Sequence, residues 1–262
     1  MILTQEQEMI RDAMRDFAQE RLAPFAGEWD RKHTFPAEAL KELGALGAMG
    51  VTVPEEWDGA GMDYMSLVLM LEEIAAGDGA TSTIVSVQNS LACGITMKYG
   101  SDEQKEKYLK PLARGDMLGC FCLTEPHTGS DASAITTRAT RDGDHFVLNG
   151  VKQFITTGKH AQVAIVFAVT DKAAGKKGIS CFLVPTETPG YIVARIEEKM
   201  GQHASDTAQI IFENCRIPAS CLLGQEGDGY RIALSNLEAG RIGIAAQSVG
   251  MARSALDAAV KY

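Results

Sequence analysis

The sequence is poor in aromatic residues, in long apolar runs and in paired cysteines. Phe, Trp and Tyr make up 6% of the 262 residues, which argues against an aromatic-rich binding surface. No apolar run approaches the roughly 18 residues of a membrane-spanning helix. The six cysteines include no Cys-x-x-Cys pair, so we expect no metal site, no disulfide scaffold and reduced thiols. The first residues lack the basic and apolar regions of a signal peptide, and we expect a cytoplasmic protein.

Positive charge is also scarce. The chain has 25 Lys and Arg against 34 Asp and Glu, a net charge of −9 and a sequence pI near 5.1. This balance argues against a nucleic-acid partner, because nucleic-acid binders usually carry a basic face. Apolar residues make up 45% and charged residues 23%, as in ordinary globular proteins, and the length suits one large domain or two smaller ones.

The first and middle thirds of the chain differ in pattern. Capping-box sequences at Thr4-x-x-Gln7 and Ser101-x-x-Gln104 open helices, and apolar residues recur between them at helical spacing. Short runs rich in β-branched and aromatic residues follow, separated by turn residues, and no helical pattern lies between them. The sheet should therefore be mostly antiparallel, a barrel or a sandwich. The predicted strands are residues 118–123, 146–148, 163–169, 179–184 and 207–212.

Residues 230–262 return to a long helical pattern with apolar residues on two faces. A single helix of this kind is incomplete as a domain, so we expect a longer parent chain or another chain to supply further helices. The predicted domains are an N-terminal helical domain (1–117), a middle β domain (118–225) and the first helix of a C-terminal helical domain (226–262).

Residues 120–131 are the sharpest motif. A strand ends at Thr124, and a Pro turn and a Gly-Ser-Asp turn follow. Backbone N–H groups in such a turn can face an anion such as a diphosphate, and the strand residues before it could line a flat ring. From the turn chemistry alone, a polar hairpin connection is the favoured explanation of these residues. Neither a Gly-x-Gly-x-x-Gly fingerprint nor a Gly-Lys-Ser/Thr loop occurs.

Two further segments stand out. Residues 149–158 form a tight turn that feeds a strand ending in Phe154 and two hydroxyls, although Phe154 could equally be core. In the long helix, Gly240 costs about 1 kcal/mol relative to Ala, which suggests close approach of a helix or a ligand. Glu238 and Arg241 beside it could also be a solvated pair.

Together these segments resemble the acyl-CoA dehydrogenase family of flavoproteins, most closely its short-chain, butyryl-CoA type. The resemblance covers the whole length, and it is carried by the order of four motifs. They are Thr124-Glu125-Pro126-x-x-Gly129-Ser130-Asp131, Phe154-Ile155-Thr156, Gly201-x-x-x-Ser205-Asp206-Thr207 and Arg241-Ile242-Gly243-Ile244-Ala245.

The resemblance implies FAD as cofactor and α,β-dehydrogenation of an acyl-CoA to the trans-2-enoyl-CoA in fatty acid β-oxidation. It also implies electron transfer to an electron-transferring flavoprotein, and a homo-oligomer, either tetramer or dimer. The expected FAD-binding residues are Phe121, Cys122, Leu123, Thr124, Gly129, Ser130, Phe154, Ile155 and Thr156. The expected substrate-binding residues are Ser130, Glu238, Ala239, Gly240 and Arg241, with Thr83, Ser86, Val87 and Ser90 along the acyl tail.

The sequence departs from the family pattern at several positions. Phe154 replaces the usual Trp, Thr157 the usual Asn, and His127 a small residue. The catalytic Glu of the family is expected beyond Tyr262, and its alternative position in the long helix is Gly240 here. No catalytic base is therefore assigned, and a structural role is favoured for Glu125.

Other interpretations stay open. The chain could belong to a relative that uses oxygen or another thioester. It could also be a non-catalytic fragment that binds FAD or acyl-CoA, or a helical and β protein without a ligand.

Overall fold

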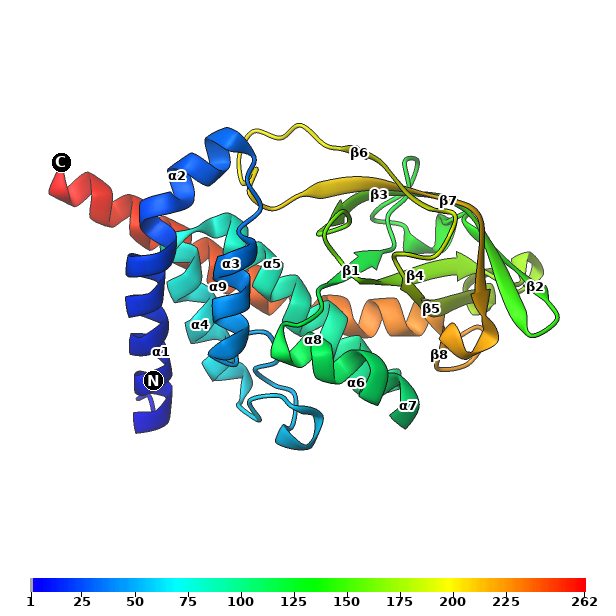
Figure 1. Cartoon of the computed structure of the whole chain (residues 1–262), viewed down its shortest axis with the longest axis horizontal. Helices are drawn as coiled ribbons and strands as arrows, with labels where there is room; N and C mark the ends of the chain where they lie inside the picture. Colours follow the sequence, from blue (N-terminus) through cyan, green and yellow to red (C-terminus); the bar gives the residue numbers. More distant parts are fainter. Residues whose placement is uncertain (1) are drawn as a thin grey trace.

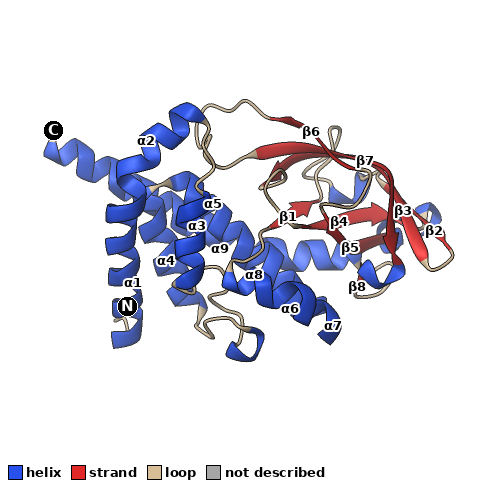
Figure 2. Cartoon of the chain, in the orientation of Figure 1, coloured by secondary structure: helices blue, strands red, loops and turns tan. Residues whose placement is uncertain are grey.

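The computed structural model describes residues 2–262 and places a group of helices beside a curved sheet (Figures 1 and 2). The N-terminal part is helical, the middle part is a sheet, and one long helix, α9 (Gly229–Lys261), extends from the sheet past the helices. The predicted fold class, a helical domain, a mainly antiparallel β domain and the start of a C-terminal helical part, is confirmed.

The helical part begins as its sequence predicts. Both capping boxes form: the Thr4 hydroxyl accepts from the Gln7 N–H, and the Ser101 hydroxyl accepts from the Gln104 N–H. Short π-helical turns join several helices end to end. The helices are α1 (Gln5–Phe17), α2 (Ala23–Lys32), α3 (Ala37–Ala45), α4 (Tyr64–Gly77), α5 (Gly79–Val87), α6 (Gly94–Tyr99), α7 (Asp102–Gln104) and α8 (Lys110–Arg114), with the π-helical turn Gln88–Cys93 between α5 and α6.

The sheet has eight strands in the order β6–β7–β3–β2–β4–β5–β8, and β1 pairs with β4. Most pairs are antiparallel as predicted, but β1 and β2 pair with β4 in parallel. The connection from β1 to β4 consists of one 3-10 turn (Ala132–Ala134) and the hairpin β2–β3, so this parallel pair forms without an α-helix between its strands. The strands are β1 (Gly119–Cys122), β2 (Arg138–Asp142), β3 (His145–Thr156), β4 (Val163–Val169), β5 (Ile179–Pro185), β6 (Tyr191–Ile196), β7 (Thr207–Pro218) and β8 (Leu222–Leu223).

Strands β4 and β5 are buried on both faces, which explains their continuous apolar sequence. Ile165 and Phe167 pack with Leu112 and Ile232 in a core shared between sheet and helices. The alternate residues of β4, such as Val166, face a second core inside the β domain. Each fully buried side chain of this size stabilises the fold by roughly 1.5–3 kcal/mol.

Helix α9 has one buried face and one exposed apolar face. Gly243 and Gly250 belong to the buried face, where an added Cβ would overlap Ser86 on α5 and the backbone of α4 respectively. Ile242, Val249 and Leu256 are 47%, 54% and 63% exposed. The two apolar faces predicted from the sequence therefore differ: the glycines let one pack closely, and the other is open to solvent.

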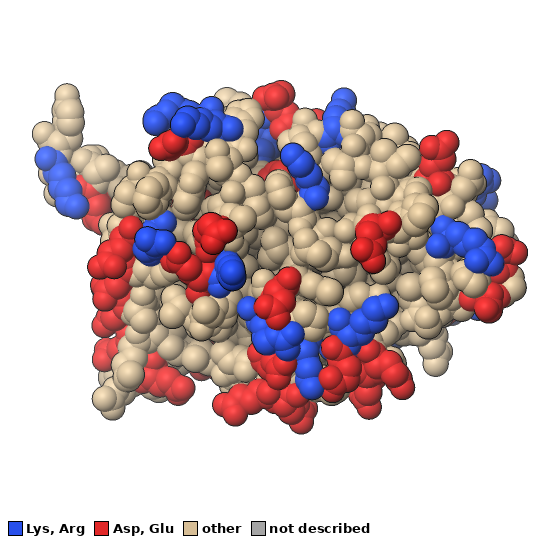
Figure 3. Space-filling view, viewed as in Figure 1, with Lys and Arg blue, Asp and Glu red and all other residues tan. Residues whose placement is uncertain are grey.

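The distribution of surface charge reflects the excess of acidic residues in the sequence. On the face shown in Figure 3, acidic side chains gather along the lower edge, and Lys and Arg form separate smaller groups. Across residues 2–262, no helix is long and apolar enough to cross a membrane.

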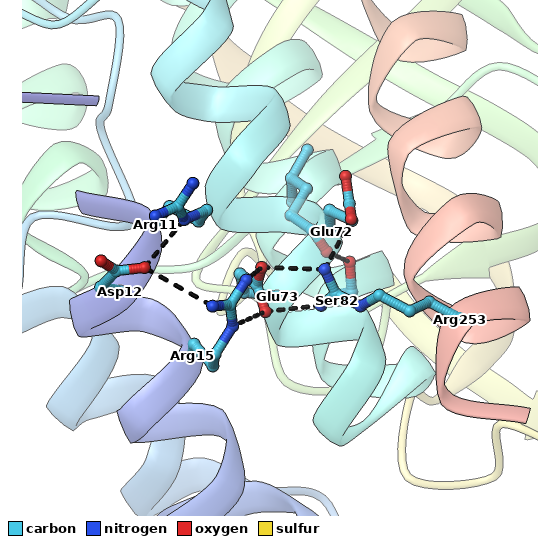
Figure 4. A network of polar contacts seen from close by, with 8 residues as sticks. Arg11, Asp12, Arg15, Glu72, Glu73, Ser82 and Arg253 are labelled. Atoms are coloured by element: carbon cyan, nitrogen blue, oxygen red, sulfur yellow. Dashed lines mark hydrogen bonds and ion pairs between the residues drawn. The ribbon is translucent and has the colours of Figure 1, made fainter. Parts of the chain in front are cut away.

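A buried carboxylate fastens α9 to two other helices (Figure 4). Glu73 on α4 has a side chain only 3% exposed, and it accepts hydrogen bonds from Arg15 on α1 and Arg253 on α9 at 2.5–3.2 Å. Arg253 also donates to Glu72 at 2.7 Å. Burial alone would raise the pKa of Glu73, but the two guanidinium groups outweigh it and hold the pKa below its usual range.

We predict that Glu73→Gln lowers the free energy of unfolding by about 2 kcal/mol near neutral pH, because two arginines lose their common partner. The folded pKa of Glu73 is depressed, so its contribution is complete above the unfolded carboxylate pKa of about 4.3 and disappears as the pH falls through the folded pKa. Denaturant titrations at pH 7 and pH 3 check this. The difference between wild type and variant should shrink in acid, and Asp12→Asn, on an exposed side chain of the same network, should change stability little.

Candidate functional site

The first motif forms the end of a strand and a turn that folds back on it. Phe121 on β1 is half-buried against Phe167, with ring centroids 5.0 Å apart, whereas Cys122 and Leu123 are buried. Gly129 and Ser130 are exposed. A Cβ built at Gly129 would lie 3.5 Å from Thr124 Cγ2, so the turn lies directly beside the strand end.

The second motif lies at a bulge in β3. The pairing of β3 with β7 shifts between Lys152 and Ile155, and Phe154 in the shifted segment has φ +59°. A bulky residue in this left-handed region is uncommon and strained. Phe154 is 63% exposed, and Ile155 beside it is 1% exposed. The bulge therefore turns an aromatic ring out to solvent, and the alternative that Phe154 is a core residue is wrong.

The structure brings these two motifs together. Gln153 N donates to Thr124 O at 2.8 Å, and Lys152 Nζ donates to Leu123 O at 2.9 Å. We call residues 121–124 with the turn 129–130 the strand-end wall, and residues 154–156 the bulge wall. The walls come from positions about 30 residues apart in the sequence, and one backbone hydrogen bond and one from the Lys152 side chain join them at one site.

Three hydroxyls in these walls are free to bind a ligand. Thr124 and Thr156 are half-buried and Ser130 is exposed. Throughout residues 2–262, no protein group hydrogen-bonds the side-chain oxygen of any of the three, while the nearby Thr136 hydroxyl donates to Glu125. An exposed aromatic ring, unpartnered hydroxyls and a glycine turn suit a flat polar-edged cofactor such as a flavin.

Beneath the walls lies a buried ion pair. Lys152 is 0% exposed and Glu125 is 2% exposed by side chain, and Nζ and Oε1 are 2.9 Å apart. Burial would raise the pKa of Glu125, but Lys152 and the hydrogen bonds from Thr136 and Thr137 lower it to about 2. Burial lowers the pKa of Lys152. A carboxylate so tightly bound fits the structural role favoured for Glu125 rather than that of a proton acceptor.

A groove of 390 Å³ lies between α5, the π-helical turn after it and α9. Several of the residues expected to bind substrate line it, and sequence reasoning missed three aliphatic ones, Leu91, Leu237 and Ile244, which the helical pattern marks only as apolar. The complete lining is Ser86, Val87, Ser90, Leu91, Leu237, Gly240, Arg241 and Ile244.

Four of the expected substrate-binding residues lie outside the groove lining: Ser130, which belongs to the strand-end wall, and Thr83, Glu238 and Ala239. The Thr83 hydroxyl donates to Gln202 Oε1 at 2.8 Å and accepts from Gln247 Nε2 at 2.6 Å, so its polar atom is occupied. Glu238 is exposed and, like Ala239, is absent from the groove lining. Their binding roles stay predictions.

Gly240 faces the groove, with space beside it. A Cβ there would lie 3.9 Å from Ser90 Oγ, an ordinary contact. Of the two explanations offered for this glycine, a nearby helix or a ligand, the close helix contact occurs instead at Gly243. The groove lining contains no carboxylate. Within the described chain, no group of three or more His, Cys, Asp or Glu side chains is arranged to hold a metal ion.

The comparisons with known proteins agree over the whole chain. Three family models match: the N-terminal domain of acyl-CoA dehydrogenase over residues 4–116, the middle domain over 120–215 and the C-terminal domain over 227–262. The mitochondrial short-chain specific acyl-CoA dehydrogenase of Rattus norvegicus is 48% identical over 260 residues, 99% of this chain. This chain spans 63% of the length of that relative.

Solved structures share the fold closely. A chain in a structure of the electron transferring flavoprotein of Acidaminococcus fermentans has a TM-score of 0.98 and 46% identity, covering 100% of this chain and 69% of that one. A glutaryl-CoA dehydrogenase from Mycobacterium smegmatis in complex with FADH2 has a TM-score of 0.93 and 41% identity, covering 99% of this chain and 66% of that one.

The turn after the bulge is strained in a way that a substitution can relieve. Thr157 has φ +62°, is 1% exposed, and its hydroxyl has no hydrogen-bond partner in the described chain. Asn has nearly the same volume and adopts the left-handed region far more readily than a β-branched residue. We expect Thr157→Asn to raise the free energy of unfolding by about 1 kcal/mol in denaturant titrations. Thr156→Asn, one residue earlier in the strand, should not stabilise; equal gains in both variants would contradict the explanation.

Proposed function

This chain belongs to the acyl-CoA dehydrogenase family, and we propose that it takes part in FAD-dependent α,β-dehydrogenation of a short-chain acyl-CoA to the trans-2-enoyl-CoA. The observation that carries the proposal is the junction of the strand-end wall with the bulge wall at one site. FAD, when bound, supplies the acceptor for the β-hydrogen of the substrate as hydride.

The residues of the walls would bind and orient the cofactor. Phe154 offers an exposed aromatic face to a flat ring, and the free hydroxyls of Thr124 and Thr156 offer hydrogen bonds to its polar edge. Ser130, exposed in the turn, would contact both FAD and the acyl-CoA. The FADH2 complex of the Mycobacterium smegmatis relative supports FAD as the ligand.

The groove supports a neutral, short acyl group. Its lining consists of aliphatic side chains, two serines, a glycine and one charged residue, Arg241. An acyl tail with a second carboxylate would find no cation other than Arg241, whose exposed guanidinium suits the anionic CoA portion instead. The short-chain specificity of the Rattus norvegicus relative supports this substrate class.

The electron acceptor and the assembly are also proposals. The similarity to a chain in the Acidaminococcus fermentans structure supports an electron-transferring flavoprotein as the partner that reoxidises FAD. A homo-oligomer, tetramer or dimer, is proposed from the family resemblance alone.

A second function is favoured by one observation, the lack of a carboxylate in the groove lining. Removing an α-proton from a thioester needs a nearby desolvated base. The described residues therefore account for binding and orientation, and we assign proton abstraction to none of them. The alternative function is binding of FAD and acyl-CoA without turnover by these 262 residues.

The visible spectrum of the purified 262-residue protein with FAD, before and after anaerobic butyryl-CoA, tests both functions. Bound flavin that bleaches supports dehydrogenation and shows that a base within the chain remains to be found. Bound flavin that stays oxidised while butyryl-CoA binds supports the non-catalytic alternative. Absence of flavin binding contradicts both.

We expect Thr156→Val to weaken FAD binding several-fold, because the isosteric change removes one hydrogen bond of about 1 kcal/mol. Fluorescence titration of FAD measures the effect. Thr140→Val is a matched control on an exposed strand position away from both walls. If the two variants bind FAD equally well, Thr156 does not contact the cofactor.

Arg241→Gln should raise the dissociation constant for butyryl-CoA, measured by calorimetry on the FAD-loaded protein, because the groove loses its cation. Arg231→Gln, an exposed position on the same helix, provides the control. Unchanged affinity in Arg241→Gln would return that residue to a solvated surface role.

A further inference from the structure

The buried pair Glu125–Lys152 joins three segments of the chain with directional bonds. The carboxylate accepts from Thr136 N at 2.7 Å, Thr136 Oγ1 at 2.9 Å, Thr137 N at 2.9 Å and Lys152 Nζ at 2.9 Å. The ammonium group also donates to Leu123 O at 2.9 Å. The pair thus ties β3 to the strand-end wall and to the segment before β2.

Stability alone does not explain this pair. A buried ion pair loses hydration on both ions, and an apolar pair of similar volume is often as stabilising or more so. Unlike apolar contacts, the ion pair makes directional interactions. Its five hydrogen bonds have defined donors and acceptors, so they fix the positions of the groups that make them. The role of the ion pair must therefore lie in where it places the groups that hydrogen-bond to it.

Those partners hold the two walls in register. Lys152 binds the carbonyl of Leu123, and its neighbour Gln153 binds the carbonyl of Thr124. Immediately afterwards β3 enters the bulge, and Phe154 turns outward at φ +59°. A shift of Lys152 would move the strand-end wall relative to the bulge wall.

We propose that Lys152 and Glu125 are positioning residues for the flavin. They do not contact the cofactor but set the separation and orientation of the two walls that would bind it. The proposal rests on the proposed function, since it assumes FAD between these walls. A ligand site misplaced by a fraction of an ångström loses much of its binding or activity.

The test compares Lys152→Met, Glu125→Gln and the double variant. Lys152→Met alone leaves the Glu125 carboxylate buried without its cation and should be strongly destabilised. The double variant removes both charges and should recover stability, but Leu123 O still lacks its donor. We expect the double variant to bind FAD about tenfold more weakly than wild type, with altered positions of the flavin absorption bands.

Glu73→Gln is the matched control. It disrupts a buried carboxylate network of the same kind, between helices rather than in the β domain. FAD affinity and the flavin spectrum are measured for each protein well below its own midpoint of thermal unfolding. Glu73→Gln should lose stability without changing either flavin property.

The outcomes distinguish the positioning role of the ion pair from the proposed function of the chain. If the wild type binds no FAD, both the proposed function and this inference are overturned. If the wild type binds FAD and the double variant matches its affinity and spectrum, only the positioning role is overturned. If flavin properties follow thermal stability in all variants, including Glu73→Gln, the pair is structural only. If the double variant does not fold, Glu125→Gln carries the same comparison.

Discussion

The close packing of α9 is the constraint on which the rest of the arrangement depends. At Gly229 an added side chain would overlap the backbone of β5, at Gly243 it would overlap Ser86, and at Gly250 it would overlap the backbone of α4. Along its length, α9 therefore packs first against β5, then against α5, which forms the other side of the groove, and then against α4. Because the groove lies between α9 and α5, the depth of that approach sets the width available to a ligand.

A second constraint acts inside the β domain, where backbone strain and buried charge occur at the same place. Phe154 in the bulge of β3 and Thr157 in the turn after it have positive φ, and Lys152 is buried just before them. Each feature costs free energy by itself. Strained backbone persists only where the surroundings over-determine it, and here the hydrogen bonds of Glu125 and Lys152 supply that support. The two walls are thus joined by hydrogen bonds of the chain itself.

Much of the fold could be predicted from local pattern. The two capping boxes, the long helix and the apolar strands β4 and β5 follow from spacing and composition. Strands β2 and β8 could not be predicted, because β2 carries exposed polar residues and β8 has only two residues, so both depend on their partners for pairing. Strand β6 was missed although its sequence, Tyr-Ile-Val-Ala-Arg-Ile, is rich in strand-forming residues. The parallel pairing of β1 with β4 is non-local, and no local sequence pattern encodes it.

For the candidate site, the sequence by itself determined which chemical groups are present: hydroxyls beside an aromatic residue, a glycine turn, and small residues on the long helix. Their order along the chain was enough to indicate the family. Only the tertiary structure decided that Phe154 is exposed rather than core, and that Gly243 rather than Gly240 makes the close helix contact. It also decided that the Thr83 hydroxyl hydrogen-bonds to Gln202 and Gln247. The physical reason is that exposure and hydrogen-bond partners depend on residues far away in sequence, which local periodicity does not specify.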